Sequence, residues 1–316
     1  MTDSERIAFS FIVDHDPVFA YQGWHLTHFL MRHFDLSTSE IHVQFTPDVP
    51  PEVIDEFRVL GCRIHQLHRF GDGRFCNKLA QWENLCGSDA EQFIFLDTDM
   101  ICLENFRSWL PRQTVAGKVV DLDNPPLDLL DGIFEQAGFE NRPPVVQIDS
   151  SDAMTYLGNC NGGLYSVSAQ FAEQLFTAWK RHALNLIANI QSLRKAGEEN
   201  HVDQIAFCLA MHETKLPFCL LPSNVNYFVH FSGRHRYYDP KLPIALLHYH
   251  NQLLNVLGYW NHRLGSNYMR QPRCPSRTVK SATILMIGCF GIFGTLVFRN
   301  AAPIEIYSLR ESAGLS

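Results

Sequence analysis

The chain has 316 residues, of which 46% are hydrophobic and 19% are charged, and its formal net charge is −7. This composition is typical of a globular protein and argues against a disordered chain. The negative charge provides no basis for a polyanion-binding surface, so we expect no nucleic-acid partner.

Nine cysteines are scattered singly along the chain, without a Cys-x-x-Cys pair. This spacing is typical of reduced thiols in a cytosolic protein, rather than of a disulfide framework or a zinc site. Residues 1–6 are polar and acidic and differ from a secretory signal. We therefore expect a cytoplasmic protein.

The first 67 residues alternate between strand and helix patterns. We expect strands at 7–13, 41–45 and 62–67 and helices at 17–34 and 51–60. Asp16 and Pro17 suit the start of the first helix. Strand–helix–strand repeats at this spacing predict an α/β fold with a mostly parallel sheet flanked by helices.

A helix at about 76–85 carries Lys78, and the apolar run at 93–96 then predicts a buried strand. Asp97, Thr98 and Asp99 follow this strand directly. Because alternate side chains point the same way on an extended backbone, Asp97 and Asp99 can share one hard cation. Ligands bind beyond the carboxyl ends of strands in open α/β sheets. A polar turn after a core strand is the alternative.

Residues 111–159 lose this regularity, and two Pro-Pro pairs interrupt them. We interpret them as an insertion that either shapes an acceptor pocket or forms a plain surface excursion. Residues 159–167 predict a loop and then a strand, and Gly162 and Gly163 allow close approach of the backbone to a ligand. The apolar stripe of the helix at 171–193 predicts core packing.

Two later segments carry polar residues at element boundaries. Asp203 and Gln204 open a helix, where a capping role for Asp203 is the alternative to a functional one. The strand at 246–250 places His248 and His250 on one face. A histidine pair, combined with the two aspartates, favours a metal role.

Taken in order, Asp97-Thr-Asp99, Asn161-Gly-Gly163, Asp203-Gln204 and His248 form a set that resembles the nucleotide-sugar glycosyltransferases of the GT-A fold. The set is most similar to family 8, the glycogenin and bacterial galactosyltransferase-like group. The resemblance covers about residues 7–260. It implies a GT-A domain at 1–270, followed by a tail at 271–316.

The resemblance also implies how a donor is held. Asp97, Asp99 and His248 would bind Mn²⁺ or Mg²⁺, which bridges the diphosphate of a nucleotide-sugar donor such as a UDP-sugar. The implied substrate-binding residues are Asp14, Lys78, Asp97, Thr98, Asn161, Gly162 and Gly163. Asp203 and Gln204 would be the catalytic pair beside the donor sugar, and the acceptor would be a glycan, a lipid-linked molecule or a protein.

One part of the family pattern is missing. The family follows its late histidine with a lysine-containing segment that holds the diphosphate, and no lysine occurs between His248 and Trp260. Either Arg263 or Lys241 replaces it, or this side of the site is more open. His250 is an alternative metal ligand to His248.

The match at Asp203-Gln204 implies transfer with retention of anomeric configuration. Gln204 is a poor nucleophile, which favours front-face attack over a covalent intermediate. An inverting reaction with Asp203 as general base is the alternative. Two other functions stay open: a nucleotidyltransferase, and an inactive transferase-like binding or scaffold protein.

The last segment differs in composition from the rest. Four basic residues precede an uncharged run at 282–298, which is at the short limit for crossing a bilayer. Basic residues before such a run are typical of an enzyme at the inner face of a membrane. A packed soluble segment or a fragment of a further domain are the alternatives.

Overall fold

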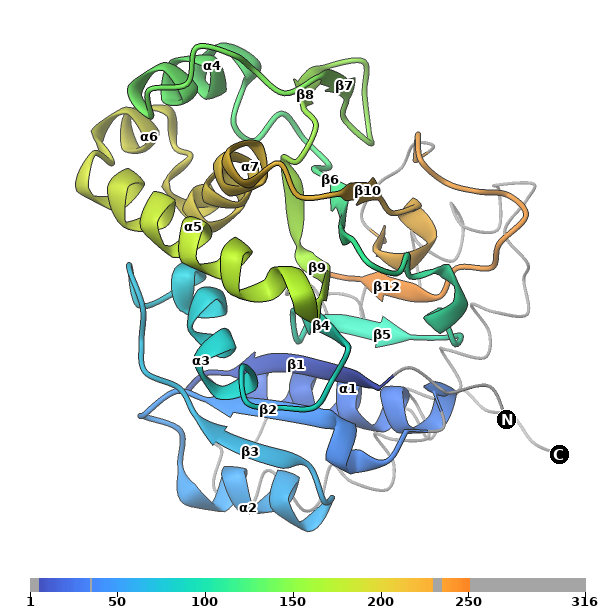
Figure 1. Cartoon of the computed structure of the whole chain (residues 1–316). Helices are drawn as coiled ribbons and strands as arrows, with labels where there is room; N and C mark the ends of the chain where they lie inside the picture. Colours follow the sequence, from blue (N-terminus) through green and yellow to red (C-terminus); the bar gives the residue numbers. More distant parts are fainter. Residues whose placement is uncertain (1–5, 35, 230–234, 251–316) are drawn as a thin grey trace, which may run out of the picture. The chain divides into compact units, whose positions relative to one another are not determined.

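The computed structural model of the chain describes residues 6–34, 36–229 and 235–250. Within these ranges, seven strands form a central sheet. Their bounds are Ile7–Val13 (β1), Ile41–Phe45 (β2), Arg63–Gln66 (β3), Gln92–Leu96 (β4), Val115–Val119 (β6), Cys160–Ser168 (β9) and Phe218–Leu220 (β10). The spatial order is β10-β6-β9-β4-β1-β2-β3 (Figure 1).

Most neighbouring strands of this sheet run parallel. The parallel pairs are β1–β2, β1–β4, β2–β3 and β6–β10, whereas β9 is antiparallel to both β4 and β6. The expected α/β fold, with a mostly parallel sheet flanked by helices, is confirmed.

Helices cover both faces of the sheet. Their bounds are Pro17–Phe34 (α1), Pro51–Val59 (α2), Gln81–Leu85 (α3), Leu127–Gln136 (α4), Ala169–Ala188 (α5), Gln191–Ala196 (α6) and Val202–Thr214 (α7). Phe9 contacts Phe34 of α1, with ring centres 4.9 Å apart, and pairs with Ile94 in β4. Phe95 therefore points to the opposite face, where it contacts Phe176 of α5 at 5.1 Å. Helices α5 and α7 lie side by side on that face (Figure 1).

Short strands form two further sheets. The bounds of these strands are Met100–Cys102 (β5), Val145–Gln147 (β7), Met154–Tyr156 (β8), Tyr227–Phe228 (β11) and Leu246–His248 (β12). One sheet has the order β11-β12-β5, and β7 pairs with β8 alone. Short 3₁₀ segments lie at Thr38–Glu40 (η1), Phe75–Ala80 (η2), Arg107–Trp109 (η3), Glu199–His201 (η4) and Ser223–Val225 (η5).

The predicted strands at 7–13 and 41–45 and the helix at 17–34 have the bounds that the structure gives. Asp16 caps that helix, because its carboxylate accepts a hydrogen bond from the Val18 amide at 2.9 Å. The helix expected at 76–85 is instead a 3₁₀ segment followed by α3. The helix expected at 171–193 is divided into α5 and α6.

Two expectations for the middle of the chain were wrong. The irregular region at 111–159 contains β6, a member of the central sheet, whose Gly117 and Lys118 interrupt the apolar pattern of a buried strand. The Asn161-Gly-Gly163 segment lies inside β9, not in a loop before it.

A cluster of side chains around a buried ion pair connects the central sheet to the sheet formed by β11, β12 and β5. Lys118 and Asp149 are both fully buried, and Lys118 Nζ lies 2.9 Å from Asp149 Oδ2. The same carboxylate contacts His235 Nδ1 at 2.6 Å and accepts a hydrogen bond from Ser223 Oγ at 2.9 Å. The Lys118 ammonium also lies 3.4 Å from the ring centre of Phe228 in β11. This cluster therefore holds β11, and with it β12, against β6.

Residues 282–298, the expected membrane-contacting run, lie outside the described residues, as does the expected tail at 271–316. Among the helices that are described, none combines the length and the apolar character needed to span a bilayer.

We expect Asp149→Ala to lower the free energy of unfolding by about 3–5 kcal/mol, because it leaves the Lys118 ammonium buried without its counter-charge. Lys118→Met, which fills similar volume without charge, should cost clearly less. Urea unfolding of both variants checks this order. Equal losses in the two variants would contradict it.

Candidate active site

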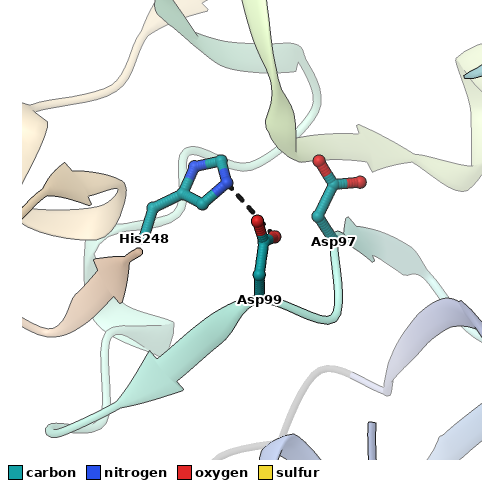
Figure 2. Close-up of side chains that lie close together, drawn as sticks. All are labelled: Asp97, Asp99 and His248. Atoms are coloured by element: carbon teal, nitrogen blue, oxygen red, sulfur yellow. Dashed lines mark ion pairs between the residues drawn. The ribbon is translucent and has the colours of Figure 1, made fainter. Parts of the chain in front are cut away.

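Two aspartates and a histidine meet at the carboxyl end of β4. Asp97 follows β4, Asp99 precedes β5, and His248 is the last residue of β12. One ligand atom from each lies within 4.8 Å of the other two. His248 Nε2 is 3.2 Å from Asp99 Oδ1, and Asp97 lies across from them (Figure 2).

Strand register brings these residues together from distant parts of the chain. In the antiparallel pair of β12 and β5, His248 lies opposite Met100. The Tyr249 amide extends this pairing by donating to the Asp99 carbonyl at 3.1 Å. The Asp97 amide donates to the Gly163 carbonyl of β9 at 3.0 Å. The Asp97–Asp99 turn is thus fixed by backbone bonds on both sides.

The three side chains fit a divalent cation. Ligand atoms on opposite sides of such a cation lie about 4 to 5 Å apart, and the atoms here lie within 4.8 Å of one another. Two carboxylates and one imidazole are donors that Mn²⁺ accepts. Burial would raise the pKa of Asp99, but the adjacent His248, together with His250 and a backbone hydrogen bond, outweighs burial and lowers this pKa to about 2. Asp99 is therefore an anionic donor at neutral pH.

Lys78 lies between Asp97 and Asp203, a residue of helix α7. Its Nζ lies 2.7 Å from Asp97 Oδ1 and 4.0 Å from Asp203 Oδ2, and it donates a hydrogen bond to the Gly162 carbonyl. Burial would lower the pKa of Lys78, but the charges of Asp97 and Asp203 outweigh burial and raise it. Lys78 is thus a charged group between two carboxylates.

Asp203 is a buried carboxylate in the first turn of α7. Burial raises its pKa to about 6, although Lys78 opposes this rise. Its Oδ1 has no hydrogen-bond partner among the described residues. Gln204 is half-buried, and its Cγ lies near Gly162. The structure therefore places the predicted catalytic pair beside Lys78.

The two glycines of β9 face opposite sides of the strand, as adjacent residues do. A Cβ atom on Gly163 would lie 2.6 Å from His248 Cε1, and one on Gly162 would lie 2.9 Å from Lys78 Nζ. Glycine is thus required at 163 so that the imidazole can pack against the strand. The structure brings both glycines into contact range of predicted site residues.

Asn161 and Thr98 make side-chain contacts within the protein. The Thr98 hydroxyl is buried and donates to Gln22 Oε1 of α1 at 3.0 Å. Asn161 Oδ1 accepts hydrogen bonds from the Gly163 amide at 2.9 Å and from Asn226 Nδ2 at 3.1 Å. Both side chains are therefore held by hydrogen bonds within the protein, next to the residues of the cluster.

Asp14 lies at the end of β1, in a separate group of polar residues. Both of its carboxylate oxygens accept hydrogen bonds from Arg69, at 2.9 and 3.1 Å, and Oδ1 also accepts from Thr46 at 2.7 Å. Burial would raise the pKa of Asp14, but these bonds hold it well below its usual range. Asp14 is thus an ionised carboxylate already engaged by a guanidinium.

His250, the alternative ligand, lies beyond the end of β12. Its ring stacks on that of His248, with centres 3.7 Å apart and an angle of 14° between the planes. The cation-compatible cluster contains His248. Of the two residues suggested for the diphosphate, Lys241 is exposed and Arg263 lies outside the described residues.

Two residues near the cluster were not identified from the sequence. Gln22 holds Thr98, and Asn226 contacts both Asn161 and His248. Both are fully or almost fully buried polar residues. The only feature of the sequence that marks Gln22 is a polar amide in the second turn of a largely apolar helix. Asn226 lies in a stretch without hydrophobic periodicity, so no pattern marks it.

Neither a protein-family model nor a curated protein sequence matches the chain. Similar solved structures include mouse xyloside xylosyltransferase 1 in its apo form, at 13% identity and a TM-score of 0.46, covering 78% of this chain and 98% of that chain. The galactosyltransferase LgtC with donor and acceptor sugar analogues is 13% identical, with a TM-score of 0.47, and covers 85% of this chain and 98% of its own. An active-site mutant of LgtC has the same identity and coverage and a TM-score of 0.48. These similarities concern the course of the backbone, so the chemistry must be derived from the side chains.

We expect Gly163→Ala to weaken Mn²⁺ binding by about 10- to 100-fold, because the added methyl group displaces the His248 ring. Gly132→Ala is the matched control, since a Cβ at Gly132 in α4 meets no atom within 4 Å. Calorimetric titration of Mn²⁺ into each folded variant measures the effect. Unchanged affinity in Gly163→Ala would contradict the placement of His248 in the cation site.

Proposed function

We propose that this chain is a glycosyltransferase that uses a divalent cation, Mn²⁺ or Mg²⁺, to move a sugar from a nucleoside-diphosphate donor to a hydroxyl acceptor. The observation that carries the proposal is the meeting of the Asp97–Asp99–His248 cluster with the buried Lys78–Asp203 pair. The four sequence segments on which the family resemblance rests all contribute residues to this one place.

The cation would be held by Asp97, Asp99 and His248. When bound, it would neutralise the negative charge that develops on the departing nucleoside diphosphate. The side chain of Asp97 is about one-third exposed, so a ligand can approach its carboxylate. Lys78 holds the other side of Asp97 and so keeps this carboxylate oriented.

Asp203 suits the stabilisation of positive charge at the sugar carbon. Its carboxylate is buried, and one of its oxygens is not used by any described group. An anion in such a position stabilises an oxocarbenium-like transition state. Together with the poor nucleophilicity of Gln204, this favours front-face attack with retention, in which the departing phosphate accepts the proton of the acceptor.

The alternatives receive less support from the geometry. A scaffold protein derived from a transferase has no need of its metal ligands, yet all three lie together here. A nucleotidyltransferase usually carries a glycine-rich basic loop after its first strand, and here Asp14 and Asp16 occupy that position. We propose a UDP-sugar as donor and a glycan, lipid-linked or protein hydroxyl as acceptor.

The proposal predicts slow, cation-dependent release of a nucleoside diphosphate from one member of a panel of nucleotide sugars. Chelation of the cation should abolish release, and Asp99→Asn should lower the rate at least about 100-fold, because a neutral amide is a weaker cation ligand. Asp89→Asn, at an exposed aspartate, should retain the parent rate. Absence of release from every donor, together with absence of nucleotide binding, would favour the non-catalytic alternative.

Asp203→Asn should separate binding from turnover. We expect Mn²⁺ and UDP to bind within about threefold of the parent affinity, whereas sugar transfer falls by about 100- to 1,000-fold, as expected when one stabilising group is lost from a transition state. Calorimetry and donor-hydrolysis rates measure the two quantities. The anomer that ¹H NMR detects first in the hydrolysis product tests retention, and the inverted anomer would support Asp203 as a general base.

A further inference from the structure

A chain of buried amide groups leads from β9 to the metal-binding histidine. Asn226 is fully buried, and its Nδ2 donates to Asn161 Oδ1 at 3.1 Å. Asn226 Oδ1 lies 2.9 Å from His248 Nδ1. Asn161 Oδ1 also accepts the hydrogen bond from the Gly163 amide. The side chains of Asn161, Asn226 and His248 thus form one continuous relay.

The direction of this relay follows from its first member. The Gly163 amide can only donate, so the Asn161 atom that faces it at 2.9 Å must be the carbonyl oxygen. Asn226 meets that oxygen with its NH₂ group, and therefore turns its own oxygen toward His248. An amide oxygen accepts only, so His248 Nδ1 must carry the proton.

This assignment determines which nitrogen is available to a cation. Because Nδ1 carries the proton that Asn226 accepts, Nε2 is the nitrogen that can offer a lone pair to a cation, in place of its contact with Asp99 Oδ1 at 3.2 Å. Metal-bound histidines generally donate their other N–H to a fixed acceptor, which sets the tautomer and the ring orientation. Asn226 provides such an acceptor here.

We propose that Asn226 is a positioning residue that holds His248 in the tautomer and ring orientation needed to bind the divalent cation. This inference rests on the cation site of the proposed function and extends it to a residue outside the ligand set. It also gives Asn161 a role behind the metal site, in addition to the sugar-side role that the family resemblance implies.

Packing of the ring does not replace Asn226 in this role. His250 stacks on one face of the His248 ring at 3.7 Å, and Phe228 lies 5.4 Å away. These contacts confine the plane of the ring, but they do not distinguish it from the same plane after a half-turn about Cβ–Cγ. A hydrogen bond to Nδ1 does distinguish the two, because a half-turn puts a carbon atom in its place.

The test measures Mn²⁺ affinity by calorimetry on the full chain, in the absence of any donor. We expect Asn226→Ala to weaken binding by about 10- to 100-fold, the usual effect of losing an outer-shell partner. Asn226→Asp should bind more tightly than Asn226→Ala, because a carboxylate still accepts from Nδ1. If Asn226 served only to stabilise the fold, Asn226→Asp should be the more damaging of the two substitutions, because it places a buried negative charge opposite the Asn161 oxygen.

Asn224→Ala is the matched control for loss of structure. Asn224 is also fully buried in the same segment, and its amide donates to the carbonyls of Asp239 and Leu242 at 3.0 and 2.9 Å. We expect its loss to lower the thermal midpoint without changing the Mn²⁺ affinity of the folded protein. An equal loss of affinity in Asn224→Ala and Asn226→Ala would overturn the proposal.

His248→Ala separates failure of this inference from failure of the proposed function. In the His248→Ala background, Asn226→Ala should cause no further loss of Mn²⁺ affinity, as expected for a residue that acts through His248. If His248→Ala weakens binding and Asn226→Ala does not, Asn226 has no positioning role. If neither the parent nor any variant binds Mn²⁺, the cation site itself is wrong.

Discussion

The structure of the site depends on the balance of charge around Lys78. Asp97, Asp99 and Asp203 gather at the end of an apolar sheet, and carboxylates that share a low-dielectric region repel one another. The Lys78 ammonium contacts two of them, and its own burial is compensated by their charge. Its hydrogen bond to the Gly162 carbonyl connects this charge balance to the backbone of β9. A cation bound to Asp97 and Asp99 would extend the same balance to a substrate diphosphate.

Strand β9 shows how the backbone makes room for these groups. Glycine inside a strand costs about 0.5–1 kcal/mol relative to alanine, and β9 carries two glycines in succession. Each is explained by a different neighbour, since Gly162 lies against Lys78 and Gly163 against His248. Local conflict between sequence and structure is expected where function sets the residue type.

The sequence predicted the parts of the fold and site that depend on local pattern. The apolar run before Asp97 predicted a buried strand, and the family resemblance carried by the four polar segments implied that Asp97, Asp99 and His248 meet. Strand β6 was missed because it contains a lysine, Lys118. This lysine can be buried only because it pairs with Asp149, 31 positions away, and no local pattern reveals that pairing. Asn226 was missed because its two contacts, 65 and 22 residues distant, exist only after the strands pair.

Lys78 and Lys118, both buried, show why an ion pair alone does not identify an active site. Lys118 and Asp149 are both inaccessible to solvent, and His235 and Ser223 satisfy the carboxylate further. Lys78 is nearly as buried, but the side chain of its partner Asp97 is 36% exposed. An ion pair that solvent cannot reach contributes only to packing of the elements around it. An ion pair with one accessible carboxylate can also bind a ligand through that carboxylate. The difference in exposure between Asp97 and Asp149 therefore distinguishes the candidate active site from the ion pair that stabilises the fold.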